Sequence, residues 1–190
     1  MKKATKLLNI MAVLAVIFIF SGSASAQGNR LKNPDFEEGY AAGWTRWAIT
    51  DSISDEENHT PGGLYSVNPS LNEAGGGFEA GALIQEFEDF KPGDTVYASA
   101  WIKTDKLRGT DNSKVYALIK IELWDGADMI RAEESEKLSG TNDWKQVNVT
   151  TSVPPQATMV KYLLMLYNPR GIIGNTGQAY FDDVYLGTTP

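Results

Sequence analysis

In three segments, 96–103, 115–124 and 160–167, every second residue is apolar and mostly aliphatic, while the residues between them are mostly aromatic, polar or charged. This alternation constrains the fold more than any other feature. Successive side chains of a β-strand point to opposite faces, so each segment offers one set to a core and the other to an outer face. The expected core positions are Val96, Ala98, Ala100 and Ile102, then Val115, Ala117, Ile119, Ile121 and Leu123, then Val160, Tyr162, Leu164 and Leu166. Beyond residue 26 no long stretch shows the 3.6-residue period of a helix. We therefore predict an all-β fold, a sandwich of two packed antiparallel sheets.

Shorter strands are expected at 83–87, 145–152 and 178–186, and long loops at 51–77 and 106–113. The first of these loops is rich in glycine, asparagine, proline and acidic residues, which is typical of irregular structure. The sequence shows neither an internal repeat nor a linker, so we expect a single domain over residues 27–190.

The N-terminus has the three parts of a secretory signal: lysines at positions 2, 3 and 6, an apolar run over 7–20, and small residues that end in Ala24-Ser25-Ala26. The alternative is an uncleaved membrane anchor, but the apolar run is shorter than the roughly 20 residues that span a bilayer. We expect cleavage after Ala26, so that residues 1–26 are removed. The mature protein is then secreted into the periplasm or the medium.

Charge and cysteine content narrow the range of partners. The signal carries three lysines and no acid, so its removal takes the net charge from −7 to −10. Nucleic-acid binding depends on clustered cationic side chains, and we expect no nucleic-acid partner. The chain has no cysteine, so the core, with or without a bound metal, must provide the stability that disulfides give many small secreted domains.

The outward sets of the three alternating segments mix aromatic rings with charged groups, and we expect them to share one outer face. Aromatic rings stack on the apolar faces of sugars, and neighbouring polar groups bind the hydroxyls. The expected platform residues are Trp101, Tyr97, Tyr116 and Tyr167, and the expected hydroxyl partners are Lys120, Glu122 and Lys161. We expect Trp44 and Trp144 to pack in the core instead.

Three stretches occur in an order that is typical of one family. The first is LKNPDFEEG at 31–39 with Gly43-Trp44, the second is LIQ at 83–85 with KPGDTVYASAWIK at 91–103, and the third leads from Asp143-Trp144 to GQAYFDDVYL at 177–186. Together they resemble the carbohydrate-binding modules of families 4, 9 and 22. Those modules are galactose-binding-like jelly rolls that are usually attached to xylanases and cellulases, so the resemblance implies a jelly-roll sandwich that binds polysaccharide.

The resemblance also implies particular site residues. Arg46 and Trp47 stand where family members bring an arginine to the binding cleft, and Phe78 stands where xylan-binding relatives often carry a platform tryptophan. A structural calcium often lies where the N-terminal glutamate meets the C-terminal aspartate, which implies Glu37 and Asp182 as ligands. Asp35 and Asp183 are the alternatives, because strand parity is uncertain by one residue. Calcium prefers six to eight oxygen ligands, and carboxylates are suitable ones.

The first functional hypothesis is a non-catalytic module that binds a polysaccharide or oligosaccharide of the β-glucan or xylan type in an open, aromatic-lined cleft. Acting as an accessory to a separately encoded glycoside hydrolase is a variant of it, and an adhesive sandwich that contacts other proteins is the alternative. We do not expect an enzyme, because no pair of acids is marked for glycoside hydrolysis. The single histidine, His59, is expected in a solvated loop. We expect a monomer.

Overall fold

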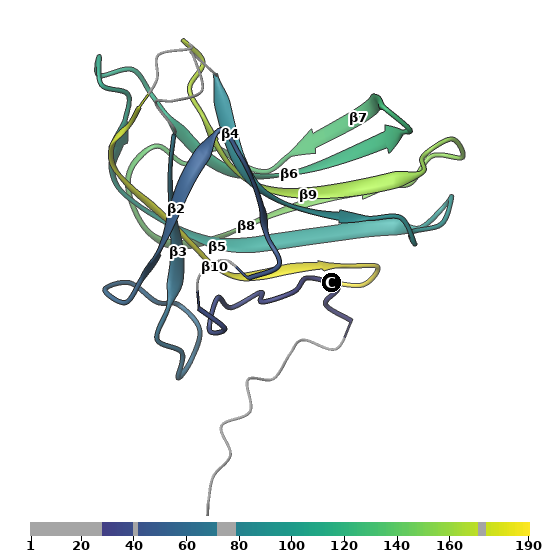
Figure 1. Ribbon diagram of the computed structural model, residues 1–190, viewed down its shortest axis with the longest axis horizontal. Helices are drawn as coiled ribbons and strands as arrows, with labels where there is room; N and C mark the ends of the chain where they lie inside the picture. Colours follow the sequence, from purple (N-terminus) through teal and green to yellow (C-terminus); the bar gives the residue numbers. More distant parts are fainter. Residues whose placement is uncertain (1–27, 40–41, 72–78, 171–173) are drawn as a thin grey trace, which may run out of the picture.

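A computed structural model describes residues 28–39, 42–71, 79–170 and 174–190, which fold into two five-stranded antiparallel sheets (Figure 1). No helix occurs among these residues. Sheet A has the order β1 (Thr45–Trp47), β4 (Ala80–Phe87), β9 (Met159–Tyr167), β6 (Tyr116–Asp125) and β7 (Asp128–Glu134). Sheet B has the order β2 (Ile49–Ser54), β3 (Ser66–Leu71), β10 (Thr176–Gly187), β5 (Thr95–Arg108) and β8 (Gly140–Ser152). The predicted all-β sandwich is therefore confirmed.

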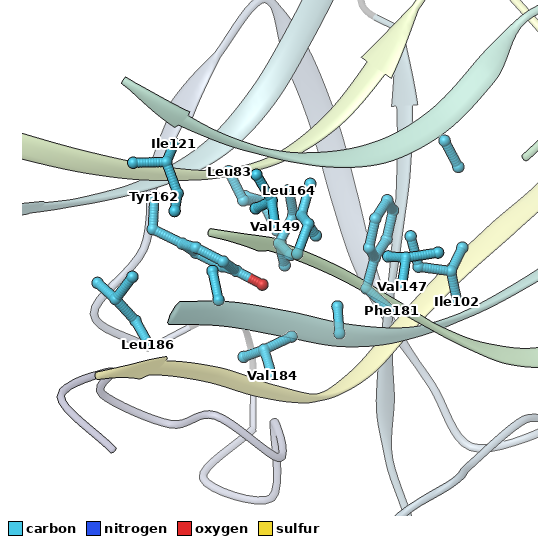
Figure 2. Close-up of a cluster of buried hydrophobic side chains, with 14 of the residues drawn as sticks. Leu83, Ile102, Ile121, Val147, Val149, Tyr162, Leu164, Phe181, Val184 and Leu186 are labelled. Atoms are coloured by element: carbon cyan, nitrogen blue, oxygen red, sulfur yellow. The ribbon is translucent and has the colours of Figure 1, made fainter. Parts of the chain in front are cut away.

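The core lies between the two sheets, and every core position predicted from the alternation is buried, none of them exposed by more than 2%. Figure 2 shows the centre of this core, where Tyr162 and Leu164 of sheet A approach Phe181 and Val184 of sheet B. The Tyr162 hydroxyl donates a 2.9 Å hydrogen bond to the main-chain oxygen of Ser99 in sheet B. A buried hydroxyl needs such a partner, and this bond also links the two sheets.

The described N-terminal segment, 28–39, forms turns rather than a strand. Its Phe36 is fully buried and stacks on Trp44 at 5.8 Å between ring centroids, and Trp44 in turn lies 6.0 Å from the Tyr162 ring. The main chain of the segment follows β10, where the Arg30 N–H donates to the Leu186 oxygen at 2.9 Å. The predicted core position of Trp44 is confirmed.

The predicted long loops were wrong in part. The 51–77 region contains the end of β2 and all of β3, and the 106–113 region begins inside β5, which continues to Arg108. Strands β1 and β7 were also missed. In β1, β2 and β7 most residues are exposed or half-buried on both faces, so hydrophobic alternation is weak.

Two sequence predictions lie outside what the structure describes. The signal peptide falls within residues 1–27, and Phe78 falls within 72–78. In the described part of the chain, no helix is long and apolar enough to span a membrane.

Candidate functional site

The four expected platform residues do not share a face. Tyr116 and Tyr167 lie in β6 and β9 of sheet A, whereas Tyr97 and Trp101 lie in β5 of sheet B. All four point away from the core, but the sandwich places the core between the two pairs. The single shared face was wrong because alternation along a strand assigns side chains to a face without assigning the strand to a sheet.

On the outer face of sheet A, Tyr116 and Tyr167 are directly opposite each other on neighbouring strands. The Lys137 ammonium lies 5.5 Å from the centre of the Tyr167 ring and 6.0 Å from that of Tyr116. Lys137 also forms an ion pair with Glu134, with 3.0 Å between Nζ and Oε2. The two rings thus form an aromatic pair at one end of this face.

Charged groups occupy the other end of the same face, and they pair with one another. Lys120 forms an ion pair with Glu122, with 2.9 Å between Nζ and Oε1. Glu122 also accepts a 3.1 Å hydrogen bond from the indole N–H of Trp124. Lys161 forms an ion pair with Glu86, with 2.7 Å between Nζ and Oε1, and its Nζ atom lies 4.5 Å from the centre of the Trp124 ring. The three residues predicted as hydroxyl partners are therefore together, and they are already held in position by ion pairs.

Between the aromatic and the charged ends, the outer side of sheet A is apolar. Met165 lies opposite Ala82 on one side and Leu118 on the other, and all three are buried. Trp47 lies opposite Ala82 on the edge strand β1 and is 42% exposed. We call this surface the sheet A face and define it by Trp47, Tyr116, Lys120, Glu122, Trp124, Lys161 and Tyr167. It brings together six of the ten predicted ligand-binding residues, namely Trp47, Tyr116, Lys120, Glu122, Lys161 and Tyr167.

Arg46 does not belong to that face. It lies opposite the core residue Leu83, on the other side of β1 from Trp47. Its guanidinium forms an ion pair with Asp51 of β2, whose side chain is fully buried. Arg46 therefore joins sheet A to sheet B at the edge of the sandwich.

The outer face of sheet B holds an aromatic cluster that the sequence did not reveal. The His59 ring stacks on Trp101 at 3.8 Å and 17°, and Trp144 meets the same histidine edge-on at 5.6 Å. The Nδ1 atom of His59 lies 2.7 Å from an oxygen of Asp183. The expectations of a solvated His59 and a core Trp144 were therefore wrong, since His59 covers Trp101 and Trp144 packs against His59.

The loop that carries His59 is anchored by a buried carboxylate. Asp182 Oδ2 accepts the N–H of His59 at 2.7 Å and that of Thr60 at 3.0 Å, and Oδ1 accepts the N–H of Asp183 at 2.7 Å. Asp183 has a positive φ of 46° within an irregularity of β10, so the two consecutive aspartates both reach the loop. Burial raises the pKa of Asp182 to about 6, although these main-chain donors act in the opposite direction.

Glu37 anchors the far side of the same loop. Its Oε1 atom accepts the N–H groups of Leu64 and Tyr65, each at 2.8 Å, and the amide of Asn58 at 3.4 Å. Gly63 lies close beside it, and a Cβ atom there would lie 2.6 Å from Glu37 Oε1, so a larger residue would displace this carboxylate. Glu37 and Asp182 thus hold the same loop from two sides, and Asp35 accepts a hydrogen bond from the Glu37 N–H in its own turn.

The donors around these two carboxylates do not fit a calcium ion in the described arrangement. Calcium takes oxygen ligands, yet the main-chain groups that reach Asp182 and Glu37 are N–H groups. The described residues contain no group of three or more His, Cys, Asp or Glu side chains that could hold a metal. Calcium binding stays a prediction.

Known structures share this architecture. The enzymatically active domain of tailspike protein 4 from bacteriophage CBA120 superposes with a TM-score of 0.62 at 16% identity, over 85% of this chain and 21% of that one. This chain therefore spans about a fifth of the length of that protein. The CBM22-1 xylan-binding domain of Paenibacillus barcinonensis Xyn10C gives 0.58 at 16% identity, over 80% and 90% of the two chains. TmCBM61 in complex with β-1,4-galactotriose gives 0.53 at 22%, over 85% and 99%.

At these identities the structural matches establish the fold alone. No curated protein sequence matched significantly. A family model described as a carbohydrate binding domain, of the CBM 4/9 type, matches residues 28–166, which is well over half of the chain. This protein therefore belongs to the CBM 4/9 family of carbohydrate-binding domains.

Proposed function

We propose that this protein is a secreted, non-catalytic module that binds a neutral polysaccharide or oligosaccharide chain, of the β-glucan or xylan type, on the sheet A face. The observation that carries the proposal is the pairing of Tyr116 with Tyr167 across β6 and β9 on an outer face. Side-by-side rings on a strand surface can contact the apolar faces of sugar residues.

The polar groups of this face suit an uncharged ligand. Lys120 and Lys161 are each paired with a glutamate, and Lys137 is paired with Glu134. A glycan with carboxylate or sulfate groups would have to compete with those glutamates for the lysines. Neutral hydroxyls can instead donate to the paired carboxylates and accept from the paired ammonium groups without breaking the ion pairs.

The apolar centre supports the same interpretation. Ala82, Leu118 and Met165 form a buried apolar layer in the middle of the face, and Tyr116 and Tyr167 pack against it. An extended chain that runs along β6 and β9 would meet the two rings at one end and the hydrogen-bonding groups at the other. Such a mixed surface is typical of sugar-binding sites.

The proposed role is recognition without bond cleavage. Each of the two glutamates at the charged end, Glu86 and Glu122, is engaged by a lysine, and Glu122 also binds the Trp124 indole. The chemistry would come from a partner, and a separately encoded glycoside hydrolase is the partner we propose. Incubation with each ligand found should release no reducing sugar.

Affinity gels that contain soluble β-glucan, xylan, galactan or mannan, or no polysaccharide, test the proposal. We expect at least one polysaccharide to retard the mature protein. Tyr116→Ala and Tyr167→Ala should each weaken that binding by roughly tenfold to a hundredfold, by analogy with interface hot spots. Tyr97→Ala is the matched control, because this tyrosine lies on the outer face of sheet B, and it should bind normally.

Melting curves must accompany the gels, because both tyrosines are only partly exposed. If both variants melt near the wild type and are still retarded in full, the sheet A face is not the site. If no neutral polysaccharide retards the wild type, the ligand class is wrong.

A further inference from the structure

A cavity on the other side of the molecule is unused by the proposed function. Its volume is about 1190 Å³, and three parts of the chain line it: the N-terminal segment, the loop at 60–62, and the outer faces of β5, β8 and β10. Small-molecule sites usually have volumes of about 300 to 1,000 Å³. This cavity is large enough for a short oligosaccharide, and it is separated from the sheet A face by the core.

The walls are fixed by hydrogen bonds within the protein. The loop is tied to the sheet by the bonds from His59 and Thr60 to Asp182. The N-terminal wall is tied to β10 by the bond from the Val184 N–H to the Pro34 oxygen at 2.9 Å. A site held in this way loses little conformational entropy when a ligand binds.

The floor combines an immobilised ring with polar groups. Trp101 is held by the stacked His59, which Asp183 holds in turn. Gln146 lies directly opposite Trp101 on β8 and is exposed, and Ser99 lies two residues before Trp101 on the same face. Trp101, Gln146, Ser99 and Asp183 all line the cavity. Together they offer an indole, an amide, a hydroxyl and a carboxylate to a ligand.

The charges select the ligand class. Three acids, Asp35, Glu38 and Asp183, line the cavity with one cation, Lys32. An anionic sugar would be repelled by this excess of carboxylates. A neutral sugar satisfies both kinds of group, because its hydroxyls donate to carboxylates and accept from the amide and ammonium groups.

We infer that this cavity is a second carbohydrate site that takes a neutral di- or trisaccharide, or the end of a chain, independently of the sheet A face. The protein is then bivalent, with one face for the length of a polysaccharide and one recessed site, between the N-terminal segment and sheet B, for a short piece of it. Two linked sites raise the avidity for an insoluble or branched glycan without new contacts at either site.

The five tryptophans provide a direct test, because each indole N–H gives its own signal in a ¹⁵N-correlated NMR spectrum. Trp47 and Trp124 report on the sheet A face. Trp101 lines the cavity, and Trp144 reports on His59, which stacks on Trp101. Trp→Phe variants assign the signals. The probes are cellobiose, xylobiose, β-1,4-galactobiose and β-1,4-mannobiose, each titrated into the full mature chain.

We expect at least one disaccharide to shift the Trp101 and Trp144 signals, with the same saturation curve in the wild type and in the Tyr116→Ala/Tyr167→Ala double variant. Gln146→Ala should weaken binding of that disaccharide about tenfold, since it removes an amide that can both donate and accept hydrogen bonds. Asn148→Ala is the matched control. Asn148 is exposed on the same face of the same strand but does not line the cavity, so this variant should bind normally.

The inference is overturned if no disaccharide moves the Trp101 and Trp144 signals, or if their shifts are unchanged in Gln146→Ala. A polysaccharide that still binds the sheet A face in those experiments leaves the proposed function intact. If instead Gln146→Ala abolishes all polysaccharide binding while the tyrosine double variant retains it, the cavity is the site and the proposed sheet A function is wrong.

Discussion

The outer faces of sheets A and B are built from the same kind of alternating strand, yet they differ in how their aromatic residues are held. On sheet A, Tyr116 and Tyr167 pack beside each other and beside the apolar cluster around Leu118. On sheet B, Trp101 lies under a loop that presses His59 onto its ring. Strand alternation brings a side chain to the surface, and the loops then decide whether that surface is open or covered.

A substitution of Phe181 tests the core, which supports the outer faces of both sheets. This side chain is fully buried in the core between the sheets (Figure 2), and Phe181→Ala should lower the unfolding free energy by about 3 to 5 kcal/mol. Chemical denaturation measures this. Because the core supports both faces, any loss of binding in this variant should follow the unfolded fraction, and a fully folded variant that binds no glycan would contradict this.

A substitution of Asp182 tests the loop on the outer face of sheet B without changing the sheet A face. An asparagine amide at this position would turn N–H groups toward the main-chain donors of His59, Thr60 or Asp183, so Asp182→Asn should cost about 2 to 4 kcal/mol of stability. Asp89→Asn is the control, because Asp89 is 71% exposed and its ion pair with Arg30 contributes little. Polysaccharide binding on the sheet A face should survive in the folded Asp182→Asn protein. Its complete loss there would show that the two faces are not independent.

The pH dependence of stability follows from the same carboxylate. Burial raises the pKa of Asp182 from 3.8 to about 6 in the folded state. The folded protein therefore binds a proton more readily than the unfolded chain between these values, and this contribution to stability is lost as pH rises from about 4 to about 6. The slope is at most about 1.4 kcal/mol per pH unit.

Denaturation of the wild type and of Asp182→Asn at several pH values isolates that contribution, since the other carboxylates are common to both. The difference in unfolding free energy between the two proteins should shift against the wild type as pH rises from about 4 to about 6. A constant difference across this range would show that Asp182 does not titrate there.

The calcium prediction has the smallest expected effect. If direct hydrogen bonds from the main chain hold the loop, adding a chelator to a calcium-saturated sample should leave the melting temperature unchanged. If calcium binds Glu37 and Asp182, it stabilises only the folded state, and the chelator should lower the melting temperature. Differential scanning calorimetry separates these outcomes.

The sequence predicted the interior better than the surfaces. Core positions such as Ile102 and Leu164 repeat with period two, and burial enforces that pattern over whole strands. β7 has no such pattern, because most of its residues are exposed on both faces of the strand. The assignment of strands to sheets depends on long-range pairing, so alternation alone could not show that Trp101 and Tyr167 lie on opposite sides.

For each strand of the candidate site, the sequence predicted which side chains share a face. It did not predict which distant segments come together. Lys120, Glu122 and Tyr116 share one strand, so their common face followed from parity. The contact of His59 with Asp183 and Trp101 joins a loop to two strands that are distant in the sequence. The main local signal for it was the pair of consecutive aspartates, 182 and 183, near the end of the chain.

Hydroxyl-radical footprinting with and without a bound polysaccharide tests most directly where the chain lies. Oxidation of each tyrosine and tryptophan is read by mass spectrometry in one experiment. We expect the polysaccharide to protect Tyr116, Tyr167 and Trp47, and to leave Tyr97 on the outer face of sheet B as reactive as in the free protein. Protection of Tyr97 with unchanged reactivity at Tyr116 and Tyr167 would contradict the account and move the polysaccharide site to sheet B.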